Sequence, residues 1–124
     1  MTLPTLEVNG TTYTLPDRPV AVVCIDGGDP EYIDAGLRDG VIPNIESFMK
    51  DGFYAVAQGS MPSFTCPNNM SIVTGTEPVE HGISGNFYLD RETGEPVVMT
   101  DPELWRKRSI MRPFPRHGAK AVSR

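Results

Sequence analysis

The chain has 124 residues, of which 39% are hydrophobic and 22% charged, and its formal net charge is −5 at pH 7. This size and composition suit a soluble globular domain with a modest core. The acidic balance argues against nucleic-acid binding, which needs a basic face, and no apolar stretch approaches the roughly 18 residues of a membrane helix.

The first forty residues contain two strand signals of different kinds. The run LEVNGTTYTL, residues 6–15, alternates around Asn9-Gly10, and Asn-Gly between alternating residues predicts a β-hairpin. The run VAVVCI, residues 20–25, is continuously apolar and mostly β-branched, and Asp26 closes it. Such a run is typical of a strand that is buried on both faces of a parallel sheet.

Two helices and a further strand are predicted next. Asp29-Pro30 is typical of a helix cap and first turn, and this helix is expected to run to about Arg38. Pro43 opens a second helix, which Gly52 ends, and residues 53–57 form a candidate strand. Strands that alternate with helices predict an α/β layer architecture.

A third helix is predicted within MPSFTCPNNMSIVTG, residues 61–75. Proline suits the first helical position, so we expect Pro67 to start the helix, Cys66 to cap it and Gly75 to end it. Thr65 then lies one residue outside, where free N–H groups and the helix dipole favour anions. Its hydroxyl could be a nucleophile, or Thr65 could be an ordinary turn residue.

Asp26 and Thr65 are expected on one edge of the sheet. Asp26 ends a predicted buried strand and Thr65 begins a predicted helix, and ligands of open α/β sheets bind outside the carboxyl ends of strands. A carboxylate and a hydroxyl are hard oxygen donors that can hold a metal ion and present an alkoxide to phosphorus. Asp26 has an equally good interpretation as a turn residue before Gly27.

The remaining chain predicts a second hairpin and an interrupted end. Residues 86–100 read as two short strands that turn near Thr93-Gly94, and Asp101-Pro102 starts a short helix. Pro113 and Pro115 interrupt the chain after that helix.

The compartment is inferred from features absent at the N-terminus and from the small number of cysteines. The N-terminus has neither the basic start nor the apolar core of a signal peptide. Cys24 and Cys66 are too few for a disulfide framework. We therefore expect a cytoplasmic protein that associates with neither nucleic acid nor a membrane.

Several phosphatase signatures can be excluded. Neither cysteine is followed by an arginine six residues later, Asp26 is not part of an Asp-x-Asp element, and no Walker loop occurs. A sulfatase carries Cys or Ser followed by x-Pro-x-Arg. The segment 65–69 has that skeleton, with Thr65 at the nucleophile position and Asn69 in place of the arginine.

This near-match leads to a family resemblance. Residues 6–111 resemble the phosphonoacetate hydrolase family of the alkaline-phosphatase superfamily through RPVAVVCIDGGDPEYIDAG, PSFTCPNNMSIVTG and EHGISGNFYLDRETGEPV followed by MTDP. The Thr-x-Pro-Asn element alone is shared with nucleotide pyrophosphatases. The resemblance implies an α/β fold with an alkaline-phosphatase-like mixed sheet sandwiched by helices, present only as its N-terminal portion and with β-hairpin excursions.

The resemblance also implies an activity and roles for three residues. The family hydrolyses the carbon–phosphorus bond of phosphonoacetate to acetate and phosphate with two zinc ions. By matching motif, Asp26 resembles a zinc ligand, Thr65 resembles the nucleophile and a second zinc ligand, and Asn86 resembles a donor to a phosphoryl oxygen. The implied partner is a small phosphonate substrate, and a homodimer is one expected state of a full-length protein.

The other candidate side chains are interpreted as structural. The residue matching His81 belongs to a structural element in the family, and His117 lies in the divergent end of the chain. Cys66 is expected to fill space at the helix cap, since nothing nearby in the sequence suggests a lowered pKa.

The sequence departs from the family in its metal ligands. A two-zinc site needs about six further ligands, many of them histidines, whereas this chain has two histidines in total. We therefore expect a single partial domain, residues 1–124, with a divergent tail from residue 112 to 124. Two alternatives stay open: an inactive fragment, and a superfamily enzyme acting on phosphate mono- or diesters.

Overall fold

The computed structural model describes residues 3–117 and 120–121. The chain divides into two compact units, Ala21–Gln58 and a first unit made of Met1–Val20 with Gly59–Arg124. The buried hydrophobic residues that form the described core all belong to the first unit. No helix among the described residues is long and apolar enough to cross a membrane.

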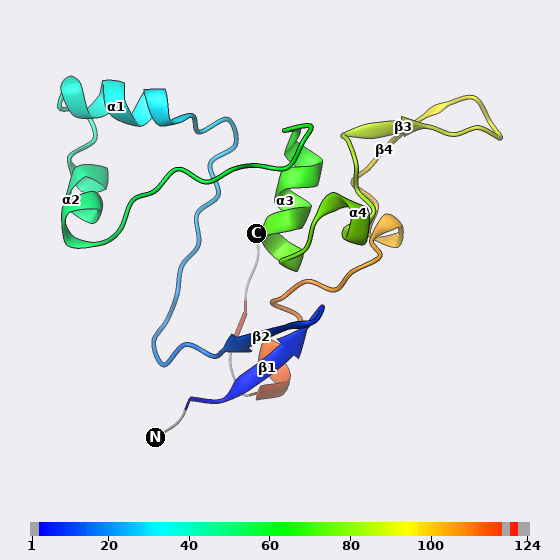
Figure 1. Cartoon of the computed structure of the whole chain (residues 1–124), viewed down its shortest axis with the longest axis horizontal. Helices are drawn as coiled ribbons and strands as arrows, with labels where there is room; N and C mark the ends of the chain where they lie inside the picture. Colours follow the sequence, from blue (N-terminus) through cyan, green and yellow to red (C-terminus); the bar gives the residue numbers. More distant parts are fainter. Residues whose placement is uncertain (1–2, 118–119, 122–124) are drawn as a thin grey trace. The chain divides into compact units, whose positions relative to one another are not determined.

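The first unit begins with the predicted hairpin. Strands β1 (Thr5–Val8) and β2 (Thr11–Thr14) pair antiparallel (Figure 1), with Thr5 opposite Thr14 and Val8 opposite Thr11. The turn residues Asn9 and Gly10 have positive φ angles of 52° and 83°. Both central residues of a type I′ turn need positive φ, which is why Asn-Gly at this position predicts the hairpin correctly.

One face of this hairpin holds the first hydrophobic cluster. Leu6, Val8 and Leu15 are buried, and the partly buried side chains packed on them include Ile110 and Phe114. Alternation along β1 puts Leu6 and Val8 on the same side of the strand. The chain after residue 109 therefore returns to cover the N-terminal hairpin.

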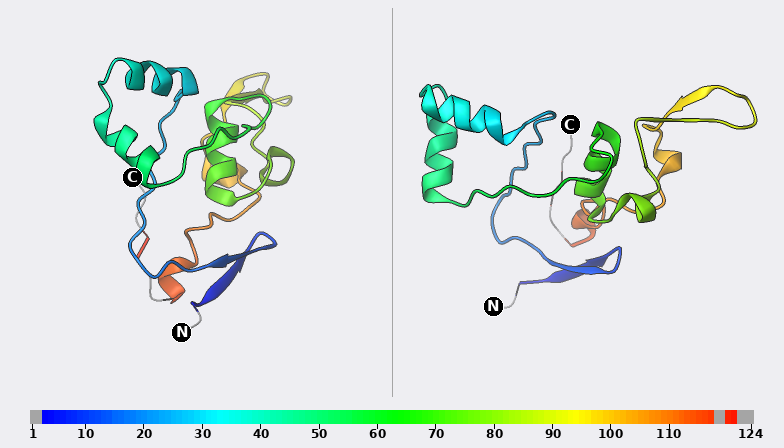
Figure 2. Two further views of the ribbon diagram at one scale, coloured as in Figure 1. Left: turned by 60° about the vertical axis from the view of Figure 1, so that its left-hand side comes forward. Right: turned by 45° about the horizontal axis from the view of Figure 1, so that its top comes forward.

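The second cluster lies around helix α3 (Thr65–Thr74). Met70 of α3 packs with Ile83 and Met99, and all three are less than 8% exposed. Helix α4 (Pro78–His81) follows α3 and lies beside it in both views of Figure 2. This short helix has no counterpart among the sequence predictions.

The predicted second hairpin is also present. Strands β3 (Phe87–Leu89) and β4 (Pro96–Val98) pair antiparallel, and the connecting turn includes Gly94 at a φ of 74°. The short helix predicted at Asp101-Pro102 is the 3₁₀ helix Pro102–Leu104, in which the Asp101 carboxylate accepts the Glu103 N–H at 2.9 Å.

Pro113 and Pro115 interrupt the secondary structure near the end of the chain less than the sequence predicts. A second 3₁₀ helix, Phe114–His117, forms next to Pro113 and contains Pro115, since a single short turn needs few N–H donors. Residues 118–119 and 122–124 of the predicted divergent tail lie outside the described residues.

The second unit contains the two predicted helices, α1 (Pro30–Arg38) and α2 (Pro43–Asp51). Asp29 caps α1 by accepting the Glu31 N–H at 2.8 Å, and proline occupies the first position of both helices. These observations confirm the predicted starts, because a proline costs nothing where the N–H has no helical partner.

The two strands predicted in the second unit are wrong as strands. Residues 20–25 and 53–57 are extended but have no ladder partner within the described ranges. Val22 and Val23 are each 80% exposed and Phe53 is 89% exposed. A strand exists only when a second segment pairs with it, so an apolar run predicts where burial is favoured but does not supply the neighbouring strand.

Gly75 gives a test of the packing at the end of α3. Its φ is 65°, and an added Cβ would collide with the Tyr13 hydroxyl oxygen. Gly75→Ala should therefore destabilise the protein by about 2–3 kcal/mol, since backbone strain and overpacking add. The measurement is urea unfolding followed by circular dichroism.

Gly94→Ala is the matched control, because Gly94 also has a positive φ but no heavy atom lies within 4 Å of an added Cβ. It should cost about 1 kcal/mol, the backbone term alone. Tyr13→Phe should restore part of the stability in the Gly75→Ala background. Equal losses at the two glycines would contradict the predicted collision.

Candidate functional site

The candidate site begins at the first turn of α3. The helix starts at Thr65, with Phe64 as the N-cap, and its first backbone bond runs from the Asn68 N–H to the Phe64 carbonyl at 3.2 Å. The prediction that Pro67 starts the helix and Cys66 caps it is wrong by two residues. Proline is tolerated at each of the first three positions, because none of their N–H groups has a partner inside the helix.

Asn86 is linked directly to this turn. Its side-chain oxygen Oδ1 accepts the Cys66 N–H at 2.9 Å, and its backbone carbonyl accepts the Met99 N–H at 2.8 Å. Asn86 is therefore held at both ends, by α3 and by the segment that follows β4. Two of the three predicted site residues, Thr65 and Asn86, belong to the first unit. Asn86 accepts the N–H of Cys66, the residue directly after Thr65.

This bond changes the expected chemistry at the helix start. Free N–H groups at Cys66 and Pro67 cannot provide the predicted anion site, because the Cys66 N–H donates to Asn86 and Pro67 has none. The positive end of the helix dipole remains, and Thr65 occupies the first helical position with an exposed side chain. With Oδ1 used by Cys66, Asn86 has its Nδ2 group as the donor to a ligand.

Asn68 holds the turn from the other side. Its Oδ1 accepts the Ser60 N–H at 2.9 Å and its Nδ2 donates to the Phe64 carbonyl at 2.9 Å. An added Cβ at Gly59 would lie 2.9 Å from this Oδ1, so the loop passes close to the amide. Sequence reasoning assigned Asn68 no role. The sequence did contain a signal for this role. An asparagine shortly after a loop that contains glycine and serine often forms hydrogen bonds from its side chain to the loop backbone.

Asp26 lies in the second unit. Its side chain is exposed at the end of the extended segment, before Gly27, whose φ is 70°. The positive φ agrees with the interpretation of this region as a turn. A common edge shared by Asp26 and Thr65 therefore stays a prediction, since the two residues belong to different units.

The described residues do not form a complete metal centre. They include no group of three or more His, Cys, Asp or Glu side chains placed to hold an ion. Cys66 is half-buried and packs against the cluster of Met70, Ile83 and Met99, as expected for a residue that fills space.

His81 is hydrogen-bonded to α3 through Ser71. It is fully buried, its Nδ1 accepts the Ile83 N–H at 3.1 Å, and its Nε2 lies 3.1 Å from the Ser71 hydroxyl. Because the Ile83 N–H can only donate, we assign the proton to Nε2, which donates to Ser71. The pKa of His81 is lowered by burial, which a hydrogen bond with the Pro67 backbone opposes. The structure thus gives His81 the structural position expected from the sequence.

Comparisons with known proteins place these features in a family. The model of the type I phosphodiesterase / nucleotide pyrophosphatase family matches residues 20–123. An uncharacterized pyrophosphatase/phosphodiesterase of Schizosaccharomyces pombe is 36% identical over 96 residues, which are 77% of this chain and 19% of that protein. Ectonucleotide pyrophosphatase/phosphodiesterase family member 3 of Rattus norvegicus is 31% identical over 111 residues, or 85% of this chain and 12% of that protein.

Two crystal structures of a phosphonoacetate hydrolase from Sinorhizobium meliloti 1021 have a similar backbone. The complex with phosphonoformate matches at 40% identity and a TM-score of 0.86, covering 95% of this chain and 29% of that one. The complex with phosphonoacetate matches at 39% identity and a TM-score of 0.87, covering 97% and 29%. The predicted fold class is confirmed: the chain is α/β and matches the N-terminal portion of an alkaline-phosphatase-like domain.

The chain therefore spans less than a third of the solved hydrolase and less than a fifth of these curated relatives. The described residues contain no strand that pairs with residues 20–25 or 53–57.

The lowered pKa of His81 predicts a pH dependence of stability. The unfolded chain takes up a proton near the ordinary pKa of 6.5, before folded His81 does. The stabilising contribution is therefore complete above about pH 6.5 and is lost as the pH falls from there through the folded pKa. We expect a lower melting temperature at pH 5 than at pH 7.5, measured by circular dichroism.

His81→Asn is the control, since its amide oxygen can accept the Ile83 N–H but the side chain does not titrate. The variant should be less stable at pH 7.5 and should vary less between pH 5 and 7.5. If the difference in melting temperature between pH 5 and pH 7.5 is the same in His81→Asn as in the unsubstituted chain, His81 is not the source of the pH dependence.

Proposed function

Because this chain belongs to the type I phosphodiesterase / nucleotide pyrophosphatase family, we propose that it carries the nucleophile half of a hydrolytic site that acts at phosphorus. The similarity to solved phosphonoacetate hydrolases supports a specific reaction for the whole protein, hydrolysis of phosphonoacetate to acetate and phosphate. The observation that carries the proposal is the bond from the Cys66 N–H to Asn86 Oδ1, since it keeps an amide beside Thr65 at the positive end of α3.

The proposed roles divide the first step between two side chains. The Thr65 oxygen attacks phosphorus and the carbon–phosphorus bond breaks, with its electron pair going to carbon beside the carboxylate. The hydroxyl loses a proton and the carbon gains one, which gives acetate and a phosphorylated Thr65. Asn86 Nδ2 donates to a phosphoryl oxygen as its negative charge grows. Water then releases phosphate and restores the hydroxyl.

Zinc belongs to the proposal for the whole protein only. Asp26 and Thr65 are the two proposed ligands in this chain, and both would bind through oxygen, whereas zinc in proteins normally has three or four ligands with nitrogen or sulfur prominent. The described residues thus do not fit a complete zinc site. A threonine hydroxyl is a weak nucleophile near pH 7, so its activation requires groups beyond those described.

A second candidate function is supported by the sequence relatives. The family model and the matching curated proteins are phosphodiesterases and pyrophosphatases, so hydrolysis of a phosphodiester is the alternative reaction. An inactive fragment is the third hypothesis, and it rests on the small number of metal donors. The small phosphonate substrate is supported by the ligands named in the solved complexes. A cytoplasmic location and a homodimer remain proposals from the sequence.

The test of the nucleophile uses a chimera in which this chain replaces the matching segment of the S. meliloti hydrolase. Thr65→Ala in the chimera should lower turnover of phosphonoacetate by at least about 100-fold, as expected for a residue that forms a bond in the reaction. Thr65→Ser should retain part of the rate, because the hydroxyl remains. Near-normal phosphate release by the alanine variant would refute the assignment of Thr65.

The same chimera separates the two reactions. The ratio of activity on bis(p-nitrophenyl) phosphate to activity on phosphonoacetate is compared with that of the parent hydrolase. An unchanged ratio is what phosphonoacetate hydrolysis predicts, and a raised ratio supports the phosphodiesterase alternative. A folded chimera that is inactive on both substrates would contradict the proposed nucleophile half, because the remainder of the chimera comes from an active hydrolase.

Substitution of Asn86 can distinguish its two bonds. Asn86→Asp keeps an oxygen that accepts the Cys66 N–H but loses the Nδ2 donor and adds a negative charge near the phosphoryl oxygens. Its stability should stay close to that of the unsubstituted chimera, while turnover falls by about 100-fold or more. Asn86→Ala should lose about 1–3 kcal/mol of stability as well, because the partly buried N–H is left without its acceptor.

These effects are measured by thermal unfolding and phosphate release on the same protein samples. If Asn86→Asp retains full turnover, Asn86 does not donate to the substrate and its role is confined to holding α3.

A further inference from the structure

The first unit also contains a cavity of about 470 Å³ between the turn of β1–β2 and the segment 106–113. Four of its lining side chains are cationic, and Glu7 is the acidic one. The cavity is lined by Glu7, Val8, Asn9, Arg106, Lys107, Arg108, Arg112 and Pro113. The whole chain has a net charge of −5, so this cluster is a local reversal of charge.

The backbone beneath the cluster is fixed by hydrogen bonds to distant parts of the unit. Asn9 Nδ2 donates to the Arg108 carbonyl at 2.8 Å, and Asn9 Oδ1 accepts the Arg108 N–H at 3.4 Å. The Arg106 N–H donates to the His81 carbonyl at 3.2 Å. The carbon stem of Arg106 lies over Gly82, where an added Cβ would be 2.8 Å from its Cδ. The cationic side chains thus extend from an ordered backbone.

Few carboxylates balance these cations. Within the described part of the chain, the ion pair that involves the cluster joins Lys107 Nζ to Glu80 at 2.9 Å. Glu7 is the one carboxylate among the residues that line the cavity, and it also accepts the Thr12 hydroxyl at 3.4 Å. Four cations around one cavity repel one another, and a bound anion would relieve that repulsion.

From this charge and geometry, we propose that the cavity binds a small polyanion with at least two phosphate-like charges, of which inorganic pyrophosphate is the simplest example. Arginine presents a planar set of donors that matches phosphate oxygens, and three of the four cations are arginines. The volume lies within the usual range of small-ligand pockets, about 300–1,000 Å³. A long nucleic acid is less suitable, because it would extend over the acidic remainder of the chain.

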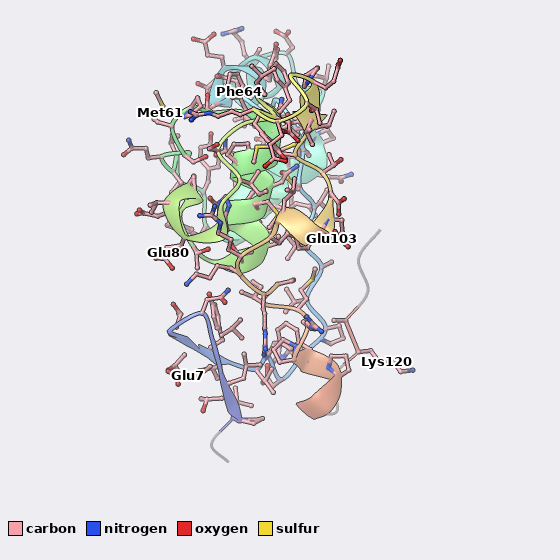
Figure 3. All side chains as sticks on the ribbon, turned by 90° about the vertical axis from the view of Figure 1, so that its right-hand side faces the viewer. Glu7, Met61, Phe64, Glu80, Glu103 and Lys120 are labelled. Carbon is pink, nitrogen blue, oxygen red and sulfur yellow. The ribbon has the colours of Figure 1, made fainter. Side chains whose placement is uncertain are left out.

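This site is separate from the candidate catalytic residues. Glu7 and Phe64, which precedes Thr65, lie at opposite ends of the first unit (Figure 3). Helix α3 has ten residues, about 15 Å, and Asn9 contacts the carbonyl of its last residue, Thr74. Binding in the cavity therefore does not depend on the proposed reaction at Thr65.

The test is titration of the 124-residue chain with sodium pyrophosphate at constant ionic strength and without divalent metals. Trp105, the single tryptophan, precedes Arg106 and provides a fluorescence signal, and calorimetry gives the stoichiometry. We expect saturable binding of one pyrophosphate. The double variant Arg106→Gln/Arg108→Gln should bind at least about ten-fold more weakly, because two charge-assisted hydrogen bonds are lost.

The matched control, Arg38→Gln/Arg91→Gln, removes the same charge at two arginines that do not line the cavity and should bind within about two-fold of the natural chain. Glu7→Gln removes the acidic lining group and should bind roughly two- to five-fold more tightly. Tighter binding by Glu7→Gln cannot arise from unfolding. This variant therefore tests the proposal even if circular dichroism shows that the Arg106/Arg108 variant does not fold.

Three results would overturn the proposal. They are binding that is still unsaturated at roughly 10 mM pyrophosphate, about ten-fold weaker than a Kd of 1 mM, equal weakening in both double variants, and no gain with Glu7→Gln. A single-stranded oligonucleotide that displaces pyrophosphate at a lower phosphate concentration would also overturn it, in favour of a nucleic-acid partner.

Discussion

The bond between the Cys66 N–H and Asn86 Oδ1 is the contact on which the candidate site depends. It is the point where the start of α3 meets the segment leading into β3. The backbone of Asn86 is fixed in turn by the Met99 N–H, and Met99 belongs to the buried cluster beneath α3. The position of the Asn86 amide is thus set by the same packing that anchors the helix.

Helix α3 also joins the two hydrophobic clusters of the first unit. In the middle of the helix, Met70 packs with Ile83 and Met99, and the next residue, Ser71, accepts a hydrogen bond from His81. At its end, the Val73 carbonyl accepts the Ile110 N–H at 2.8 Å, which brings Ile110 to the hairpin cluster. The carbonyls of Ser71, Val73 and Thr74 at the end of α3 therefore have protein donors, and none of these donors is a cationic side chain of segment 106–112.

The features that the sequence predicts correctly depend on neighbouring residues in the chain. Asn9-Gly10 determines its hairpin because both residues must adopt positive φ, and Asp29 caps α1 by reaching two residues ahead. The start of α3 is predicted wrongly because its cap is supplied by Asn86, twenty residues away, rather than by a local side chain. Proline at position 67 is compatible with three different helix starts, so the sequence alone cannot choose among them.

The strands predicted over 20–25 and 53–57 are wrong for a related reason. Their composition reports how buried the segments would be in a sheet, and hydrogen-bonded pairing depends on a second segment that the composition does not encode. The same reasoning applies to the site. Asn86 is bonded to the Cys66 N–H, next to Thr65 and in the same unit, whereas a role for Asp26 with Thr65 requires the arrangement of two units.

The arrangement at Thr65 also indicates where substrate choice has to be made. A nucleophile and an amide that contacts phosphoryl oxygens act on the phosphorus group, which phosphonates and phosphodiesters share. The difference lies in the leaving group, which stands opposite the nucleophile: a carbanion beside a carboxylate in one case and an alkoxide in the other. The carboxylate calls for a cation near the leaving group, since a positive charge there stabilises both the bound acid and the developing carbanion. Segment 106–112 is bonded to the end of α3 away from Thr65, through Ile110 to Val73 and through Asn9 to Thr74, so its cations do not fill that role. Selection of phosphonoacetate over a phosphodiester therefore requires a cation that approaches Thr65 from outside this cluster.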